Sequence, residues 1–212
     1  MAANIAGIRS NVRKDLHDET TPYLWVDASL DRHIGRAVVE YSLADPLEQK
    51  TTLVTVANSR DISIASLANL IDIEAVEWPT LQFPPARVGY SLWSTTLTLD
   101  TVAAPNSVQN VFVFWTKMHT LDASSSSIPA KFDELIAEGA AGYAALDWTT
   151  YAANRINIGG DDAWGRYQAL AQERLQRFRA DLARLGRDNT VRQRRMYTTD
   201  APTVFEQNRV KY

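Results

Sequence analysis

The sequence predicts an α+β protein, mainly an α-helical bundle of about four helices with a small antiparallel β-rich insertion and an extended C-terminal arm. Three observations predict this fold class. Apolar residues recur at helical spacing near both ends of the chain, β-branched residues dominate the stretch between them, and the last part follows neither pattern. The expected divisions are 1–47 and 124–186 as two helical pairs, 48–123 as the insertion, and 187–212 as the arm.

The first helical pair is predicted from two apolar stripes. Ile5–His17 has its apolar residues on one face, at steps of three and four. A second stripe begins after Asp27, a residue type that often caps helices, and it runs to Tyr41. Pro46 ends this helix, because the residue before a proline is pushed out of helical geometry. The first 47 residues are therefore expected to form two helices.

The insertion is predicted from short runs of β-branched and aromatic residues that are separated by turn residues. Several such runs at close spacing favour a small antiparallel sheet. One stretch, Asp61–Asn69, can equally be a short helix after a turn. The expected strands are Thr51–Val56, Asp61–Ile64, Leu70–Val76, Val88–Trp93, Thr95–Leu99 and Val108–Thr116.

The second helical pair begins with a long helix over Pro129–Arg155, since proline suits the first turn of a helix. Gly139 and Gly142 lie in its middle, where glycine costs about 1 kcal/mol relative to alanine. Two such glycines suggest close contact with another helix or backbone. The last helix, Trp164–Leu185, is amphipathic, and Gly186 is expected to end it.

The composition allows one domain with a real core and excludes several kinds of site. The 212 residues are 45% hydrophobic and 22% charged, which is ordinary for a folded protein. The absence of cysteine excludes a disulfide scaffold, a thiolate metal site and a cysteine nucleophile. No signal peptide and no membrane-spanning run of roughly 18 apolar residues is found, so we expect a soluble protein made in the cytoplasm.

Charge is distributed unevenly along the chain. Residues 166–212 contain eleven Lys/Arg and five Asp/Glu, a net charge of +6, whereas residues 1–165 carry −9. An acidic body with a basic end suggests an interaction tail. The alternative is a basic helix end followed by a solvated tail.

Candidate catalytic groups are few. The three histidines, His17, His33 and His119, have no spacing typical of metal ligands. A nucleophilic triad of His119, Asp122 and a serine from Ser124–Ser127 is conceivable, but the serine run lacks a strained nucleophile turn. We therefore predict no enzymatic activity, no catalytic residue, no metal ligand and no cofactor.

The carboxylates leave one enzymatic alternative open. Asp72, Glu74 and Glu77 are expected on the solvent face of a strand. A glycosidase-like pair of acids from distant parts of the chain stays possible, because such partners need not be neighbours in sequence. A small hydrolase with dispersed carboxylates is therefore a second hypothesis.

The C-terminal segment combines arginines with aromatic residues, the types enriched at binding hot spots. It has too few apolar residues to fold alone, and we expect it to become ordered on a partner. A plain solvated tail and a nucleic-acid-binding arm are the alternatives. The predicted partner-binding residues are Arg192, Arg194, Arg195, Met196, Tyr197, Phe205 and Tyr212.

Several segments taken together are similar to a known family. Val12–Asp18 and Tyr23–Ile34 resemble the opening of head-to-tail adaptor (connector) proteins of tailed bacteriophages and prophages. Gly139–Leu146 and Trp164–Leu185 look like the second helical pair of that family, and Arg192–Tyr197 looks like the start of its C-terminal arm. The resemblance covers most of the chain in the order of its elements.

The resemblance implies a structural virion protein of the neck, between capsid and tail, that is assembled in the host cytoplasm. The implied partners are the portal protein, which the arm would bind, neighbouring copies in a ring expected to hold twelve, and a downstream tail or neck protein. Genomic DNA would pass through the ring without sequence-specific contact, and no membrane is involved. The β-rich insertion would face outward or toward the next tail component.

Two further hypotheses remain. A stopper or tail terminator of the same machine would be more β-dominated than the helical content predicted for this chain. A regulatory DNA-binding protein would read DNA with its first two helices, but the charges on that surface are mixed.

Overall fold

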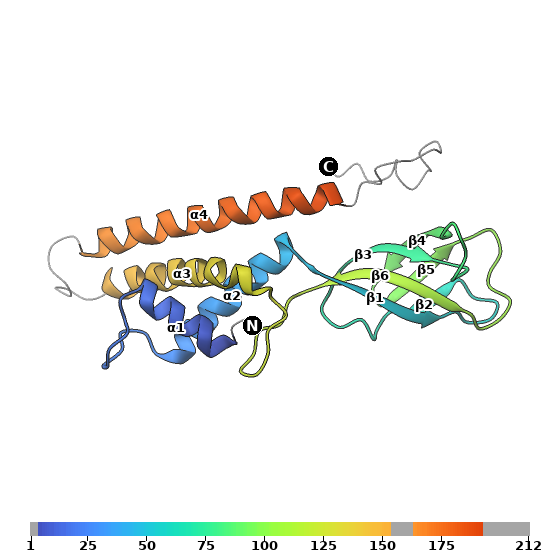
Figure 1. Ribbon diagram of the computed structural model, residues 1–212. Coiled ribbons are helices and arrows are strands. Elements are labelled where there is room, and N and C mark those ends of the chain that lie inside the picture. Colours follow the sequence, from blue (N-terminus) through green and yellow to red (C-terminus); the bar gives the residue numbers. More distant parts are fainter. Residues whose placement is uncertain (1–3, 154–162, 193–212) are drawn as a thin grey trace. The chain divides into compact units, whose positions relative to one another are not determined.

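The structure, a computed structural model, describes residues 4–153 and 163–192 (Figure 1). Their contacts divide them into two units. The helical unit contains the described residues of Met1–Pro46 and His119–Thr190, and the sheet unit is Leu47–Met118. Each unit has its own hydrophobic core.

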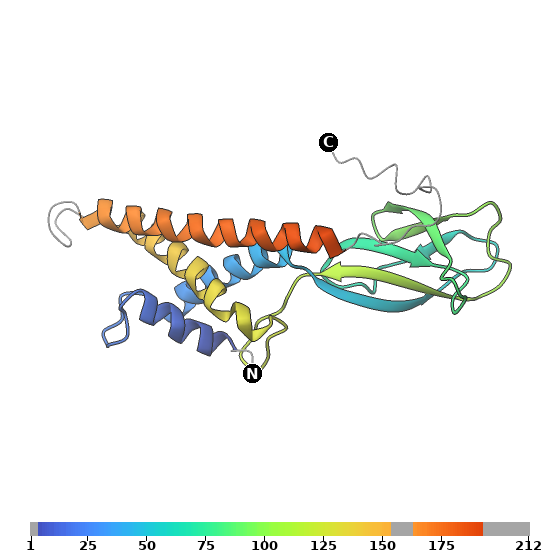
Figure 2. The same ribbon diagram turned by 45° about the horizontal axis from the view of Figure 1, so that its top comes forward.

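The helical unit consists of four α-helices and one short 3-10 helix. Buried apolar side chains come from all four α-helices, and Leu30, Ile34, Ile136 and Phe178 are completely buried in its core. The helix α4 lies along the other three (Figure 1 and Figure 2). The elements are α1 (Ile5–Asp15), α2 (Asp27–Ala44), η1 (Ala130–Phe132), α3 (Asp133–Ala153) and α4 (Ala163–Arg192).

The ends of the first two helices differ slightly from the predictions. The side chain of Asn4 caps α1 by accepting a 3.0 Å hydrogen bond from the backbone N–H of Gly7. This helix ends at Asp15, before the predicted His17, which adopts a positive φ of 55°. Asp27 is not the N-cap that we predicted but the first residue of α2, and its carboxylate binds arginine side chains instead.

The sheet unit is one six-stranded antiparallel sheet with the strand order β1-β6-β3-β4-β5-β2, bent into a half-barrel (Figure 1). Each of the six predicted runs forms a strand, which settles the alternative for Asp61–Asn69: this stretch begins with a strand and not a helix. The strands are β1 (Leu47–Val54), β2 (Asp61–Ser63), β3 (Leu70–Glu77), β4 (Arg87–Trp93), β5 (Thr96–Asp100) and β6 (Asn110–Lys117).

The predicted fold class is wrong in its proportions. We expected a mainly helical bundle with a small β-rich insertion, but the sheet closes a second core of ten buried residues, among them Ile73, Leu97 and Val113. Alternating residues of neighbouring strands face the same side of the sheet and bury one another there. The β-region is therefore a folded unit in its own right.

The predicted end of the last helix at Gly186 is also wrong. The helix α4 continues through Gly186 to Arg192, so residues 187–192 are helical. A glycine inside a helix is disfavoured by only about 1 kcal/mol, and neighbouring interactions can outweigh this preference. The remaining residues of the predicted arm lie outside the described residues.

Candidate functional site

The candidate site is centred on Arg13, a buried arginine of α1. Its Nη1 donates to a carboxylate oxygen of Asp18 at 2.5 Å. Its Nη2 donates to the carbonyl oxygen of Trp25 at 2.9 Å and to a carboxylate oxygen of Asp27 at 2.7 Å. The side chains of Arg13 and Asp18 are only 9% and 6% exposed, so this pair is shielded from water. Charge-assisted hydrogen bonds of this kind are stronger than neutral ones.

Asp18 connects this pair to the loop before α2. Its carboxylate accepts hydrogen bonds from the backbone N–H groups of Leu24 and Trp25, at 2.7 and 3.3 Å. The indole of Trp25 is buried and donates to the carbonyl oxygen of Ala144 in α3 at 3.2 Å. The loop is thus fixed from two sides, by the buried carboxylate and by the packed indole.

A second arginine extends the ionic network across the surface. Arg9 binds Asp31 with two parallel hydrogen bonds of 2.8 Å, and it reaches Asp27 at 2.9 Å. Hydrogen bonding to Asp31 raises the pKa of Arg9, and hydrogen bonding from Arg13 lowers the pKa of the Asp27 carboxyl. The raised pKa of Arg9 and the lowered pKa of Asp27 both mean that the charged form of each side chain is favoured.

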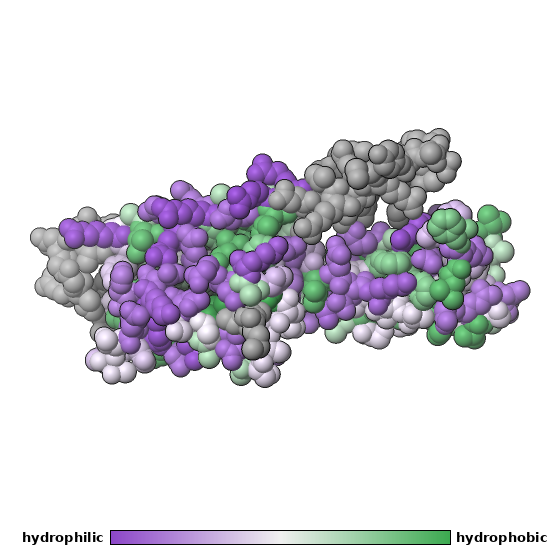
Figure 3. Space-filling view, viewed as in Figure 1, coloured by the Kyte–Doolittle hydropathy of each residue, from purple (hydrophilic) through white to green (hydrophobic). Residues whose placement is uncertain are grey.

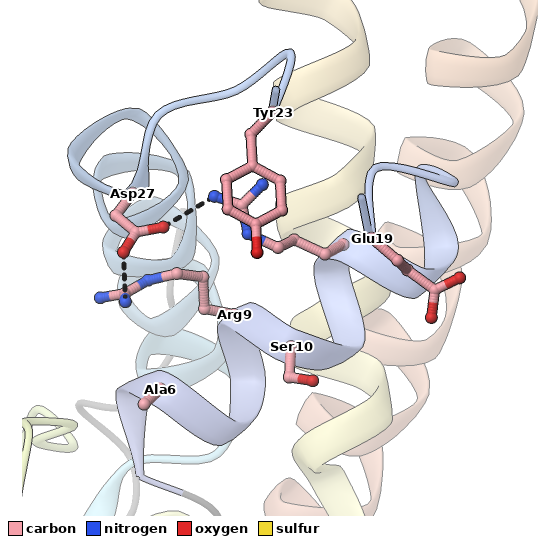
Figure 4. Close-up of a pocket in the computed structure, with 7 residues that line it drawn as sticks. Ala6, Arg9, Ser10, Glu19, Tyr23 and Asp27 are labelled. Carbon is pink, nitrogen blue, oxygen red and sulfur yellow. Dashed lines mark hydrogen bonds and ion pairs between the residues drawn. The ribbon is translucent and has the colours of Figure 1, made fainter. Parts of the chain in front are cut away.

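An open hollow of about 400 Å³ lies over these residues. Figure 4 shows Arg9 reaching Asp27 on one side, with the ring of Tyr23 beside the network. The guanidinium of Arg13 lies 3.8 Å from the centre of that ring, a cation–π contact. Both arginines that line the hollow already bind carboxylates, so their charges are compensated within the chain. The hollow is lined by Ala6, Arg9, Ser10, Arg13, Glu19, Tyr23 and Asp27.

The fixed loop exposes three large apolar side chains, of which Tyr23 lines the hollow. Tyr23, Leu24 and Val26 are 46%, 43% and 67% exposed, and we call them the 23–26 surface. Their backbone is held by the contacts of Asp18 and Trp25, so binding a partner would require little further ordering. A rigid, exposed apolar surface of this kind is typical of a protein–protein contact.

The sequence analysis did not identify the 23–26 surface. Val12–Asp18 and Tyr23–Ile34, the two segments that carried the family resemblance, contain most of the residues of the network. The available signal was a helix with two arginines, followed by an apolar loop with carboxylates around it. The arginines are Arg9 and Arg13, and the carboxylates are Asp18, Asp27 and Asp31. Sequence spacing alone does not show that these charges meet.

The predicted close approach of α3 to another helix is confirmed. A methyl group built on Gly139 would lie 2.9 Å from ring carbons of Phe178, and one on Gly142 would lie 2.9 Å from a side-chain carbon of Leu175. Real side chains essentially never come that close. The two glycines therefore let α4 pack directly on α3.

The triad considered from the sequence is not assembled. Nδ1 of His119 lies 3.1 Å from the Ser127 hydroxyl, while Nε2 lies 3.0 Å from the carbonyl oxygen of Asp45. Asp122 instead accepts hydrogen bonds from the backbone and hydroxyls of Ser124–Ser125, which lower its pKa to about 2. The imidazole therefore lacks the carboxylate that orients the base of a triad.

His33 is buried on α2, where its Nε2 lies 3.6 Å from a carboxylate oxygen of Asp147. Burial lowers the pKa of this imidazole, against the opposing effect of Asp147. Among residues 4–153 and 163–192, no group of histidine and carboxylate side chains is arranged to hold a metal ion. Within the same ranges, no helix has the length and apolarity needed to cross a membrane.

One of the strand carboxylates is not where we expected it. Glu77 was predicted on the solvent face, but it is only 7% exposed, and it accepts a 3.3 Å hydrogen bond from the backbone N–H of Leu81. This hydrogen bond from the loop after β3 offsets part of the cost of burying the carboxylate. Asp72 similarly accepts a hydrogen bond from the backbone N–H of Ile73.

The predicted partner-binding residues lie at or beyond the end of the described chain. Arg192 is the last residue of α4, and its side chain is not described. The other six are outside the described residues: Arg194, Arg195, Met196, Tyr197, Phe205 and Tyr212.

Comparison with known proteins gives similarity to solved structures only. No protein-family model matches the chain, and a search of curated proteins finds no match. Among solved structures, the chain is similar to a chain of "Neck of empty GTA particle computed with C6 symmetry". The two share 15% identity over 82% of this chain and 88% of that chain, with a TM-score of 0.29. A TM-score at this level does not establish a shared fold.

Proposed function

We propose that this chain is a structural subunit of the neck of a tailed phage or phage-like particle, and specifically a head-to-tail adaptor that forms a ring under the portal. The observation that carries the proposal is the 23–26 surface. It presents exposed apolar side chains on a backbone that is fixed by buried charges and a buried indole. A subunit that must fit a neighbour benefits from such a surface, because little conformational entropy is lost on contact.

The sequence resemblance to adaptor proteins supports the same role. The segments that resemble the family, Val12–Asp18 and Tyr23–Ile34, are those that build the ionic network and the 23–26 surface. In this proposal the 23–26 surface contacts the neighbouring copy in the ring. A closed ring makes a weak contact effective, since each subunit is held on two sides.

The C-terminal segment 193–212 is proposed to bind the portal. Its arginines and aromatic residues suit a hot spot, and several copies acting together would add avidity. The ring would extend the DNA channel without binding DNA tightly, because the chain is acidic over residues 1–165. No catalytic step is part of this role.

One experiment tests both contacts. The full chain is mixed with its portal and imaged by electron microscopy, beside a chain that lacks residues 193–212 and a chain with Tyr23→Ser, Leu24→Ser and Val26→Ser. We expect rings on portals only for the unchanged chain. The truncated chain should stay folded without binding portals, and the triple variant should bind portals without closing rings. If neither variant differs from the unchanged chain, the adaptor proposal is wrong.

A second candidate role is a stopper or tail terminator of the same neck. The six-stranded sheet with its own core favours this alternative, because such components are expected to be rich in β-structure. The same images separate the two roles. An adaptor binds isolated portals, whereas a terminator binds tail tubes and leaves portals bare.

A further inference from the structure

Three loops of the sheet unit meet at one end of the sheet. β1 ends opposite the start of β6, at the pair Val54 and Asn110, and β3 ends opposite the start of β4, at Glu77 and Arg87. β5 ends at Asp100, opposite Gly89 near the start of β4. The loops 55–60, 78–86 and 101–109 therefore lie together, at the end away from the start of β1 and the end of β6 (Figure 1).

These loops expose their large apolar side chains almost completely. Phe83 and Val102 are 98% and 100% exposed, and Leu81 is 85% exposed. Val56 and Val108 add to the same end, at 57% and 68%. Figure 3 shows hydrophobic residues gathered over this end of the sheet. We call these five residues the apolar crown.

The three loops that carry the apolar crown are also nearly free of charged residues. Among the 24 residues of the three loops, Arg60 is the single charged residue, although 22% of the whole chain is charged. The guanidinium of Arg60 donates to the carbonyl oxygen of Val102 at 2.6 Å, a hydrogen bond between two of these loops. The neutral loops have no cluster of basic residues for a nucleic acid or an anionic membrane.

The crown is held in place by hydrogen bonds between its loops. The backbone N–H of Asn58 donates to the carbonyl oxygen of Pro105 at 2.7 Å. The hydroxyl of Thr55 donates to the carbonyl oxygen of Ser107 at 2.9 Å, and the indole of Trp78 donates to the side chain of Gln109 at 3.0 Å. These bonds join the first and second loops to the third. The apolar side chains are thus presented on a fixed frame.

We propose that the apolar crown is a self-association surface, by which two copies of the free protein pair crown to crown across a two-fold axis. In such a contact the residues near the two-fold axis meet their own copies, so charges close to the axis would repel one another. A neutral apolar surface has no such repulsion, and pairing removes its side chains from water. This contact differs from the ring contact of the proposed function, which is head-to-tail, and it does not depend on that function.

Cysteine cross-linking gives a direct test, because the chain contains no cysteine of its own. Phe83→Cys is compared with Trp93→Cys, a residue that is 84% exposed at the opposite end of β4. Under mild oxidation, we expect a disulfide-linked dimer from the first variant and little from the second. Equal yields from both variants, or no dimer from Phe83→Cys, would overturn the proposal.

Sedimentation velocity on the full chain provides the second measurement. The double variant Phe83→Asp with Val102→Asp should weaken pairing by about tenfold or more, since it places like charges on the contact. Trp93→Asp is the matched control and should pair normally, and circular dichroism checks that all variants are folded. If the unchanged chain stays a monomer over a roughly hundredfold concentration range, the proposal fails. Loss of pairing in the control, or binding of the crown to phosphatidylcholine vesicles in place of pairing, would also overturn it.

Discussion

The ring of Phe178 on α4 lies directly over Gly139 on α3. A Cβ atom added to this glycine would come within 2.9 Å of three carbons of that ring. Phe178 is completely buried, so the ring has no open space into which it can turn. Together with the contact of Leu175 on Gly142, this contact lets α4 approach α3 closely.

This contact predicts that Gly139→Ala destabilises the helical unit. The methyl group forces the buried ring to shift, and overpacking of a core typically costs about 1–3 kcal/mol. Alanine is otherwise the better helix former, so a loss of stability would be due to packing. Urea unfolding, followed by circular dichroism, measures the change in the free energy of unfolding.

Gly35→Ala is the matched control for Gly139→Ala. Gly35 lies in the middle of α2, and a Cβ atom added there meets nothing within 4 Å. We expect this variant to stabilise the protein by about 0.5–1 kcal/mol, because alanine is preferred in helices. If both variants shifted the free energy of unfolding in the same direction, the packing explanation would be wrong.

Removal of the Arg13 side chain should be strongly destabilising. Arg13→Met leaves the buried carboxylate of Asp18 without its cation, and breaking a buried ion pair typically costs about 3–5 kcal/mol. Arg177→Met is the control, since Arg177 pairs with Glu173 on the exposed surface of α4, where such pairs contribute about 0–1 kcal/mol. Chemical denaturation of both variants checks this difference, and similar losses would contradict the role given to burial.

Stability should fall as the pH is lowered through the range of histidine titration. Burial lowers the pKa of His33 in the folded protein, so the unfolded chain binds the proton more readily. The stabilisation is therefore present above the unfolded pKa of about 6.5 and is lost as the pH falls below it. Asp147, Arg32 and Arg36 face this imidazole and modify the shift. The free energy of unfolding measured from pH 8 to 5 should fall less for His33→Gln than for the unchanged chain, and parallel curves would refute the assignment.

The loop at Asp122 should remain intact in moderate acid. Hydrogen bonds from Ser124–Ser125 lower the pKa of this carboxyl to about 2, below its unfolded value. Its contribution is present above the unfolded pKa and is lost as the pH falls toward 2. Carboxyl resonances followed by NMR should place the Asp122 titration near that value. A titration near 4 would mean that the loop does not form these bonds in solution.

The positions of the strands and helices could be predicted from the sequence, because periodicity and turn residues identify single elements. All six predicted strands formed, and three of the four predicted helices were found within a few residues of their expected ranges. The continuation of α4 past Gly186 could not be predicted in this way. A glycine changes helix stability only slightly, and interactions between elements decide the outcome.

Features that depend on distant parts of the chain were missed. The burial of Arg13 arises because α1 ends at Asp15 and the chain then turns back, which brings Asp18 onto the guanidinium. The apolar crown depends on the strand order, which places three separate loops at one end of the sheet. Neither arrangement leaves a signature in local spacing. The predicted partner-binding residues of the C-terminal segment remain a prediction.

The contact between His119 and Asp45 has a consequence for how this chain can change. Nε2 of His119 lies 3.0 Å from the carbonyl oxygen of Asp45. The chain therefore leaves the helical unit and re-enters it at almost the same point. β1, which follows Asp45, pairs with β6, which precedes His119, and the pairing begins with Leu47 opposite Lys117. Because each unit has its own core, we expect that replacing the residues between them by a short bridge, or by another module, leaves the helical core intact. Recombination at this junction would let one scaffold acquire new surfaces without rebuilding its core.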